Sequence, residues 1–400
     1  MTVTRTAPHM MTLILIAGLA ISTTNVIVPS LLMIARDFDA PYALMSIAFG
    51  GYLAVTAIVQ LFAGPLSDRF GRRPVLLVAL GVFSVASLGC ALAQSVEVFL
   101  FFRLMQASVI TGAALAMVVV RDLYGTREAA SRIGYISAAT AIAPLIGPML
   151  GGILADTLGW QSMFWAFAGI GVVLVAVLWL DLGETNAAPS KTVLEQFRQY
   201  PDLIGSRRFW GYAICSSSSV SGFFIFLASA PIVANALMGL SQTQLGIMIG
   251  TITVGFVTGT IITGRLAKRV ALIRLMIAGR ISTLFGATLG FALVFSDLLT
   301  PLTLAASVVF VGFGNGLTIP SSNIGVMSVR PQIAGSAAGF SGALIVATGA
   351  FVSLIAAAII TPEAGAFRMY AMIMISGVVG MCAALYVGHM DKLRAGETLA

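Results

Sequence analysis

Long stretches without Asp, Glu, Lys or Arg are the feature that most constrains this chain. A helix that crosses a membrane needs roughly 20 mainly apolar residues. Residues 209–264 carry no charge and are long enough for two such helices, with a turn near 239–242. Two further apolar segments each contain one arginine, Arg103 or Arg280. The other uncharged stretches of sufficient length are 6–35, 40–67, 74–96, 133–155, 157–180, 298–329, 331–362 and 369–390. The sequence therefore predicts an all-α membrane protein of about twelve transmembrane helices.

The composition excludes an ordinary soluble domain. The chain of 400 residues is 58% hydrophobic and 9% charged, whereas soluble domains carry about 25% charged residues. The formal net charge of +7 is typical of the basic loops that membrane proteins keep in the cytoplasm, so we expect no nucleic acid binding. Cys90, Cys215 and Cys382 each lie in an apolar run, which suits packing residues. Since neither a metal-ligating cluster nor a Ser/His/Asp set is visible, we expect no metal, no cofactor and no enzymatic activity.

The distribution of basic residues predicts how the chain crosses the bilayer, because cytoplasmic loops are enriched in Lys and Arg. With the N-terminus inside, the outer loops hold little beyond Arg36 and Arg368. The inner loops then hold Arg69, Arg72, Arg73, Arg121, Arg127, Arg132, Lys191, Arg198, Arg207, Arg208, Arg265, Lys268, Arg269, Arg274, Arg330, Lys392 and Arg394. Both termini are therefore predicted to be cytoplasmic.

A polar segment near the middle of the chain divides it into two halves. We expect an N-terminal six-helix bundle over 1–181, a cytoplasmic linker over 182–207, a C-terminal six-helix bundle over 208–390 and a cytoplasmic tail over 391–400. Within the linker, Val193–Tyr200 is expected to form a short surface helix. The loops 64–69 and 264–269 have similar sequences and lie 200 residues apart, which indicates that the two halves are repeats.

The loop after the second predicted span reads Gly-Pro-Leu-Ser-Asp-Arg-Phe-Gly-Arg-Arg-Pro over 64–74. Gly64 and Gly71 are expected to permit a close helix approach and a tight turn. Asp68 is expected to form ion pairs with its basic neighbours. These neighbours are Arg69, Arg72 and Arg73. The segment resembles the signature loop of the major facilitator superfamily, which implies two six-helix bundles and a loop that latches them on the cytoplasmic side. The alternative is a basic loop that only sets the topology.

The fourth predicted span contains Arg103 and Gln106. An arginine within a membrane span is costly unless it faces protein or water. One alternative is that Arg103 extends outward toward the end of the span near Glu97. The segment also resembles the superfamily's arginine motif of this helix, which in antiporters is linked to proton transfer. At the inner end of the same span, Asp122 is expected to pair with Arg72 or Arg73.

The fifth predicted span contains two prolines and several glycines at regular spacing. The prolines remove backbone donors and bend a helix, and the glycines allow another helix to pack backbone to backbone. The residues are Pro144, Gly147, Pro148, Gly151 and Gly152. They resemble the motif of exporters and antiporters rather than uptake systems, although ordinary glycine-rich packing is the alternative.

Taken with residues 334–339, these motifs resemble the Bcr/CflA branch of bacterial drug-resistance exporters over essentially the whole chain. The resemblance implies a monomeric, multi-pass protein of the bacterial inner membrane that exchanges a small molecule for protons. That branch usually has an acid in the first span, four residues before a proline, but here Asn25 precedes Pro29. The candidates for coupling are therefore Arg103 and Asn25, and three options stay open: a proton relay through another acid, a different coupling ion, or facilitated diffusion.

Polar and aromatic residues in the apolar spans are the candidates for substrate contacts. They are Thr24, Asn25, Tyr52, Gln106, Ser217, Ser218, Phe224, Asn315 and Asn323. Because no carboxylate lies near the middle of a predicted span, we expect neutral or amphipathic substrates. The sequence predicts secondary active export of drugs or xenobiotics, with export of an endogenous amino acid or short peptide as the alternative. A receptor or lipid enzyme would need a sensing domain or a catalytic cluster, and neither is visible.

Overall fold

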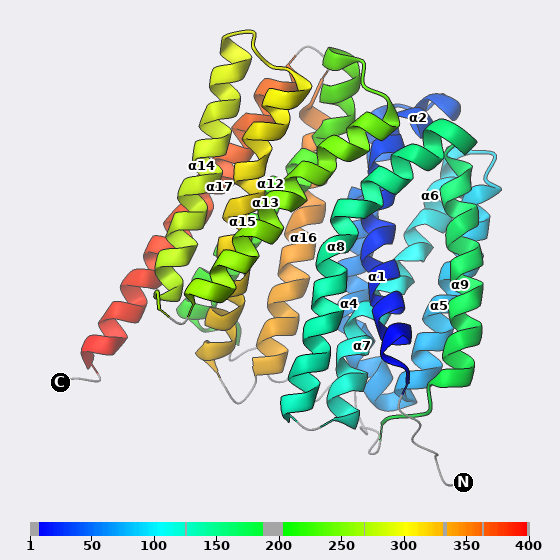
Figure 1. Cartoon of the computed structure of the whole chain (residues 1–400), viewed down its shortest axis with the longest axis horizontal. Helices are drawn as coiled ribbons and strands as arrows, with labels where there is room; N and C mark the ends of the chain where they lie inside the picture. The colour runs from blue at the N-terminus through cyan, green and yellow to red at the C-terminus, as the bar shows by residue number, and fades with distance from the viewer. Residues whose placement is uncertain are drawn as a thin grey trace. The chain divides into compact units, whose positions relative to one another are not determined.

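The computed structural model describes residues 8–124, 126–186, 203–267, 269–330, 334–361 and 364–397. Within these ranges the regular structure is entirely helical. The first half contains α1 (Met10–Val26), η1 (Val28–Ser30), α2 (Leu31–Asp37), α3 (Tyr42–Met45), η2 (Ser46–Ala48), α4 (Gly50–Phe70), α5 (Arg72–Ala91), α6 (Val96–Met105), η3 (Gln106–Val109), α7 (Ile110–Leu123), α8 (Thr126–Leu158) and α9 (Gln161–Asp181). The second half contains α12 (Arg207–Met238), α13 (Gln242–Leu266), α14 (Leu272–Phe295), α15 (Pro301–Val329), α16 (Ala334–Ile359) and α17 (Gly365–Glu397). Figure 1 shows these helices along the chain.

Twelve helical segments of the described chain are long and apolar enough to span a membrane. The first, second and fourth each run through a short 3-10 turn and join two or more of the helices above, over Met10–Asp37, Tyr42–Phe70 and Val96–Leu123. The first interruption contains Pro29, which has no backbone N–H to continue the helix. The predicted all-α fold of about twelve spans is confirmed.

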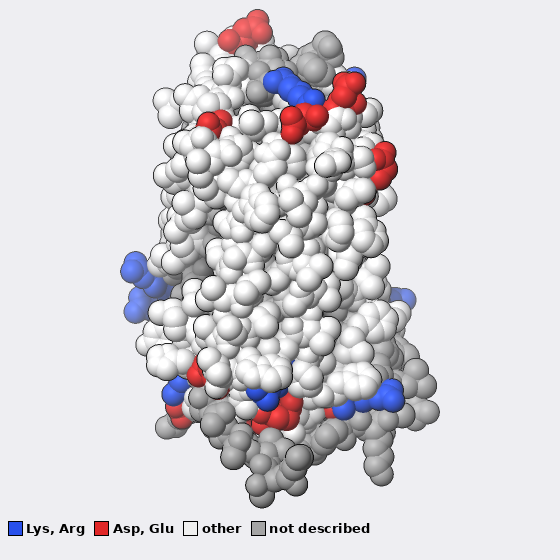
Figure 2. All heavy atoms as spheres, turned by 90° about the vertical axis from the view of Figure 1, so that its right-hand side faces the viewer, with Lys and Arg blue, Asp and Glu red and all other residues white. Residues whose placement is uncertain are grey.

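The surface of the spans is apolar. Large side chains are well exposed in several helices, for example Val78 at 65%, Val172 at 61% and Phe351 at 65%. Figure 2 shows one face of the molecule, on which most acidic and basic side chains lie toward two ends and the middle of the face is uncharged, with basic side chains only at its left and right edges. Such an uncharged middle is what a hydrocarbon environment requires.

The chain forms two compact units. Unit 1 comprises Met1–Phe197 together with Ser241–Gly246, and unit 2 comprises Arg198–Leu240 and Ile247–Ala400. Within unit 1, the Asp156 carboxylate at the end of α8 accepts hydrogen bonds from the backbone N–H groups of Gln242 and Thr243. The predicted surface helix at Val193–Tyr200 lies outside the described residues.

In unit 1, α1 packs against α7 and α8, and α5 packs against α9. The α1–α8 contact is close because α8 presents glycines there. A Cβ placed on Gly151 would lie 2.0 Å from the carbonyl oxygen of Val26, and one on Gly147 would lie 3.3 Å from the Val26 side chain. The predicted backbone-to-backbone packing of the fifth span is therefore present, and its partner is the first span.

In unit 2, α14 packs against α15 and α17, and α12 packs against α15, α16 and α17. The α14–α15 contact also depends on glycine. A Cβ on Gly279 would lie 2.5 Å from the Gly314 carbonyl oxygen, and a Cβ on Gly314 would lie 2.3 Å from that of Gly279. Small residues at such crossings are the usual means by which membrane helices pack tightly.

Candidate functional site

The signature loop forms a sharp corner between α4 and α5. Helix α4 ends at Phe70, Gly71 has a φ of +96°, and α5 begins at Arg72. A side chain at position 71 would be strained by this φ, and its Cβ would lie 2.3 Å from Oε2 of Glu184. The expected tight turn is thus at Gly71. The close helix approach expected at Gly64 is not observed, since a Cβ placed there meets no heavy atom within 4 Å.

Arg72 is the centre of an ion-pair cluster at this corner. It is only 5% exposed, and it pairs with the Asp68 carboxylate one turn earlier. Its Nε lies 3.1 Å from Oδ2 of Asp122, at the end of α7. Its Nη1 donates to the Ser67 hydroxyl. The predicted pairing of Asp122 with Arg72 or Arg73 is confirmed for Arg72, so α4, α5 and α7 are joined through one guanidinium.

The other two arginines of the loop contact aromatic residues. Arg73 donates from Nη2 to the Trp179 carbonyl oxygen at 2.7 Å and lies over the Trp179 ring, 4.9 Å from its centroid. The guanidinium of Arg69 lies 5.2 Å from the centroid of the Phe70 ring. Arg73 therefore ties α5 to α9, and Arg69 covers the end of α4.

Glu184 is a member of the cluster that the sequence analysis missed. Its carboxylate accepts from the backbone N–H of Arg72 at 2.9 Å and of Arg73 at 3.3 Å. These are the first free donors of α5, so Glu184 caps the positive end of that helix. Close by, the Asn186 side chain donates to the Asp68 carbonyl oxygen at 2.8 Å. The chain just after α9 is thereby held to the signature loop. The only signal in the sequence was that Glu184 is one of two acids, with Asp181, just after the sixth predicted span.

Arg103 is completely buried in unit 1. It donates to the Ala48 and Thr23 carbonyl oxygens, each at 3.0 Å, and to Gln106 Oε1 at 2.8 Å. Its guanidinium also lies 4.0 Å from the centroid of the Tyr52 ring, a favourable cation–π distance. Among the described residues no carboxylate forms a salt bridge with Arg103. The side chain faces protein and does not extend toward Glu97.

Several buried polar atoms near the first two spans have no hydrogen-bond partner among the described residues. They include Asn25 Oδ1 and Gln60 Oε1, whereas the Tyr52 hydroxyl interacts with the side chains of Thr24 and Thr56. Tyr52, Thr56 and Gln60 follow one another at intervals of four residues, so they share one face of α4. Thr56 and Gln60 were not predicted as substrate contacts from the sequence, although their spacing of four residues from Tyr52 and from each other was visible there. Thr24, a predicted contact, is 9% exposed at the same level of α1 as Asn25.

Unit 2 contains a second completely buried arginine, Arg280 of α14. It donates to Ser219 at 2.5 Å, to Thr318 at 3.2 Å and to Asn315 Oδ1 at 3.3 Å. Ser219 in turn donates to Asn315 Oδ1 at 2.8 Å. Among the described residues Arg280 Nη1 has no hydrogen-bond partner. The sequence signal for Arg280 was the same as for Arg103, an arginine in an apolar span, but it was not used.

The remaining candidates for substrate contacts differ in their surroundings. Ser217 and Ser218 are 7% and 8% exposed on α12. Phe224 packs against α16, where a Cβ on Gly349 would lie 2.3 Å from its ring. Gln106 accepts from Arg103 and donates to Ser87 at 2.7 Å, so its amide is already engaged. Asn323 is exposed near the end of α15.

The chain matches a known protein family over most of its length. The model of the Major Facilitator Superfamily matches residues 10–354. The chain is 30% identical over 318 residues to the multidrug resistance protein MdtL of Escherichia coli, which covers 77% of this chain and 78% of that protein. It is 35% identical over 224 residues to a chloramphenicol resistance protein of Pseudomonas aeruginosa, and this match spans 54% of the chain and 52% of that relative. These names agree with the resemblance to drug-resistance exporters.

A solved structure is similar over nearly the whole chain. The crystal structure of a D-xylose-proton symporter superposes with a TM-score of 0.73 at 18% identity, covering 94% of this chain and 96% of the other. At this identity the similarity concerns the fold alone.

Proposed function

This chain belongs to the Major Facilitator Superfamily, a family of membrane transporters rather than enzymes, and on that premise we propose that it exports small neutral or amphipathic molecules, drugs and xenobiotics among them, by proton antiport and alternating access. It acts as a monomer in a bacterial inner membrane, with both termini in the cytoplasm. The proposal has four parts: direction, substrate class, conformational coupling and energy coupling.

The direction of transport is carried by one observation, the contact between α8 and α1. Gly151 approaches the Val26 backbone so closely that a Cβ would lie 2.0 Å from its carbonyl oxygen. This glycine belongs to the proline- and glycine-containing segment that resembles the motif of exporters. The names of the relatives, multidrug resistance and chloramphenicol resistance, support export in the same sense.

The substrate class follows from the polar groups that the spans leave available. The side-chain oxygens of Asn25 and Gln60 have no protein partner among the described residues, so they are free to hydrogen-bond a substrate, and the hydroxyls of Tyr52 and Thr56 interact with one another nearby. All four groups are neutral. The buried cation nearest to them, Arg103, already donates to three protein oxygens. Such a set favours an uncharged molecule with hydroxyl or amide groups over one that needs a carboxylate partner.

Conformational coupling is assigned to the cluster of Arg72, Asp68, Asp122 and Glu184. This cluster joins α4, α5, α7 and the segment after α9 by charge-assisted bonds, which are stronger than neutral ones. Two of its members, Asp68 and Arg72, belong to the loop that resembles the superfamily's cytoplasmic latch. We place this end of unit 1 in the cytoplasm because of its basic residues.

Energy coupling is assigned to protons, although Asn25 replaces the usual first-span acid. Asn25 is 4% exposed and donates to the Ile21 carbonyl oxygen at 3.0 Å, which leaves its Oδ1 where a carboxylate oxygen would otherwise lie. An arginine does not release a proton in the working pH range, so Arg103 does not carry the proton itself. The relay would use an acid outside the centre of the spans, such as Asp122.

The test is flux in proteoliposomes that contain the purified protein and an imposed pH gradient, with chloramphenicol as the first compound of a neutral panel. We expect accumulation against the substrate gradient, its loss when a protonophore collapses the pH gradient, and an altered pH profile for Asn25→Asp. Flux that is unchanged after collapse, with no effect of Asn25→Asp, would refute proton antiport.

A resistance screen tests the substrate class separately. Expression of the protein should raise resistance to neutral antimicrobials in a sensitive host. If resistance is unchanged and a deletion strain accumulates a metabolite instead, the protein exports that metabolite and the drug assignment is wrong.

A further inference from the structure

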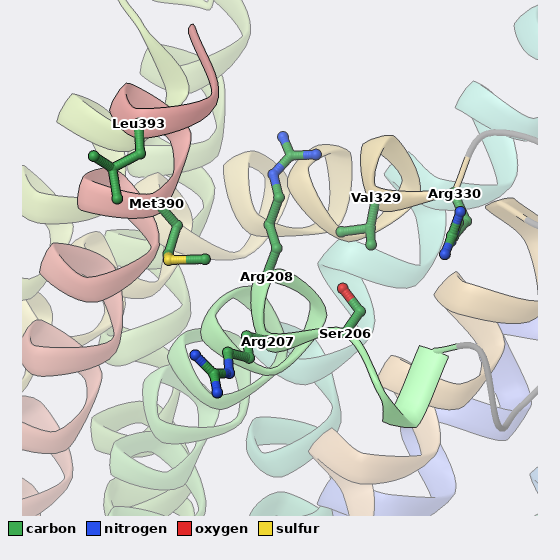
Figure 3. A pocket seen from close by; sticks show the side chains of 7 residues that line it. All are labelled: Ser206, Arg207, Arg208, Val329, Arg330, Met390 and Leu393. Carbon is green, nitrogen blue, oxygen red and sulfur yellow. The ribbon is translucent and has the colours of Figure 1, made fainter. Parts of the chain in front are cut away.

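A cavity of about 460 Å³ opens at one end of unit 2, where α12 begins and α15 and α17 end. Its lining residues come from all three helices, the residue before α12 and the residue after α15. They are Ser206, Arg207, Arg208, Val329, Arg330, Met390 and Leu393. In Figure 3 the Arg208 side chain extends between Met390 and Leu393 on one side and Val329 on the other, and Arg330 lies beyond Val329.

The charge of this cavity is positive and only partly balanced. Arg208 donates from Nε to Asp391 at 2.6 Å and from Nη2 to the Ser328 hydroxyl at 3.1 Å. Asp391 also accepts a hydrogen bond from the Tyr212 hydroxyl, so both of its carboxylate oxygens already have a donor. Arg207 and Arg330 are exposed, and neither forms a salt bridge with a described residue. None of the lining residues is acidic.

The start of α12 brings a positive helix end to the cavity, which offsets the negative C-terminal end of α15. The Ser206 hydroxyl accepts from the Phe209 backbone N–H at 3.3 Å, as a helix-capping residue does. The N-terminal end of a helix carries a partial positive charge. An anion with several acceptor oxygens is the ligand that suits two exposed guanidinium groups that form no salt bridge with a described residue.

The apolar residues of the cavity wall favour a phospholipid over a soluble phosphate compound as the source of that anion. Met390 and Leu393 lie four and seven residues after Tyr386, so these three residues share one face of α17. Tyr386 is 45% exposed and Leu393 51% exposed, and the neighbouring Leu385 is 53% exposed. An exposed apolar face therefore leads along α17 from the span to the cavity. A soluble phosphate compound gains nothing from this face, whereas an acyl chain does.

We propose that this cavity binds the phosphate of an anionic phospholipid, with Arg207 and Arg330 as its ionic partners and the acyl chains along α17. Basic pockets between membrane helices suit such headgroups. The lipid would bridge the ends of α12, α15 and α17. The inference goes beyond the proposed transport and does not depend on the substrate.

Trp210 provides a probe for the test, because it is the only tryptophan between residues 198 and 400. Its indole donates to the Ile204 carbonyl oxygen at 2.8 Å, which holds it within one turn of Arg207. The full-length protein is reconstituted into phosphatidylcholine vesicles that contain a small fraction of dibrominated phosphatidylglycerol or dibrominated phosphatidylcholine. The Trp210 contribution is obtained as the difference in fluorescence between the wild-type protein and the Trp210→Phe variant.

We expect brominated phosphatidylglycerol to quench Trp210 at a roughly tenfold lower fraction than brominated phosphatidylcholine, given two guanidinium contacts near an anionic surface. The double variant Arg207→Gln, Arg330→Gln should lose this preference, and the corresponding pair of lysine substitutions should keep most of it. The matched control is Arg269→Gln with Arg274→Gln, which removes the same charge from the same unit and should keep the preference.

Three results would overturn the proposal. Equal loss in the control would mean general attraction by charge, and an unchanged preference in Arg207→Gln, Arg330→Gln would mean that the cavity is not the site. Relief of quenching by equimolar glycerol phosphate would identify a soluble phosphate as the ligand. Since no substrate is present in this assay, its outcome is independent of whether the export proposal holds.

Discussion

The Asp122 carboxylate at the end of α7 lies 3.1 Å from Nε of Arg72, the first residue of α5. The two side chains are 21% and 7% exposed, so the pair is partly shielded from solvent. The same guanidinium also pairs with Asp68 on α4. One arginine therefore pairs with two carboxylates from two helices, and the loss of either acid leaves it with a single carboxylate partner.

Asp122→Asn and Asp68→Asn test this cluster. Each removes one charge and keeps the shape, and leaving a buried group less well paired costs about 1–3 kcal/mol. We expect transport to fall by roughly ten- to hundredfold while insertion into the membrane persists. Flux in proteoliposomes and the amount of folded protein after size-exclusion chromatography give the two readouts.

Glu128→Gln is the matched control for these variants. Glu128 pairs with Arg132 at 2.8 Å, but its side chain is 55% exposed, and such surface pairs contribute about 0–1 kcal/mol. Its transport should stay near wild type. Normal flux in Asp68→Asn and Asp122→Asn would show that the cluster has no part in transport.

Gly71→Ala and Glu184→Ala together test the capped corner. The left-handed φ of +96° at Gly71 costs an alanine about 1–2 kcal/mol, and the new Cβ would also collide with Glu184. Glu184→Ala should cost about 0.5–2 kcal/mol through the lost cap of α5. In thermal unfolding, the double variant should be less destabilised than the sum of the two single variants, because the collision is gone. Strict additivity would contradict the contact between residues 71 and 184.

Arg103→Lys should abolish export even though the charge remains. A lysine ammonium is a compact point charge and does not reproduce the planar set of donors with which Arg103 reaches Ala48, Thr23 and Gln106. Arg103→Met should also abolish export, and it leaves two backbone carbonyls without a donor. Arg274→Lys is the control, since it makes the same substitution at an exposed residue of α14. Export by Arg103→Lys at wild-type rate would refute a role for the donor geometry.

Gly151→Val tests the α8–α1 contact. Its side chain has no room beside Val26, and overpacking of this kind costs about 1–3 kcal/mol or more. We expect lower thermal stability and loss of export. Gly169→Val on α9 is the control, because a Cβ there meets no heavy atom within 4 Å and the residue is exposed. Equal effects of the two substitutions would show that helix propensity, and not the contact, is responsible.

Much of the candidate site was open to prediction because its motifs are local in sequence. The stretches without charged residues predicted the transmembrane spans. The loop from Gly64 to Pro74 predicted that Arg72 and Asp68 lie next to each other. The Arg72–Asp122 pair was predictable because the basic loops place both residues at the same side of the membrane. Glu184 was missed, since nothing in its own neighbourhood indicates that it caps α5 from 112 residues away.

The sequence by itself determined that this protein lies in a lipid bilayer. A chain with so few charged residues, arranged in long apolar runs, cannot cover its surface with polar groups. The sequence also determined that the backbone must be helical, since each span has to satisfy its own hydrogen bonds in hydrocarbon. Only the tertiary structure decided what surrounds the two arginines inside the spans. Arg103 and Arg280 look alike in sequence, yet Arg103 is held by backbone carbonyls and Gln106, whereas Arg280 meets Ser219, Thr318 and Asn315. The partners of a buried charge come from other helices, and their identity depends on how the helices pack.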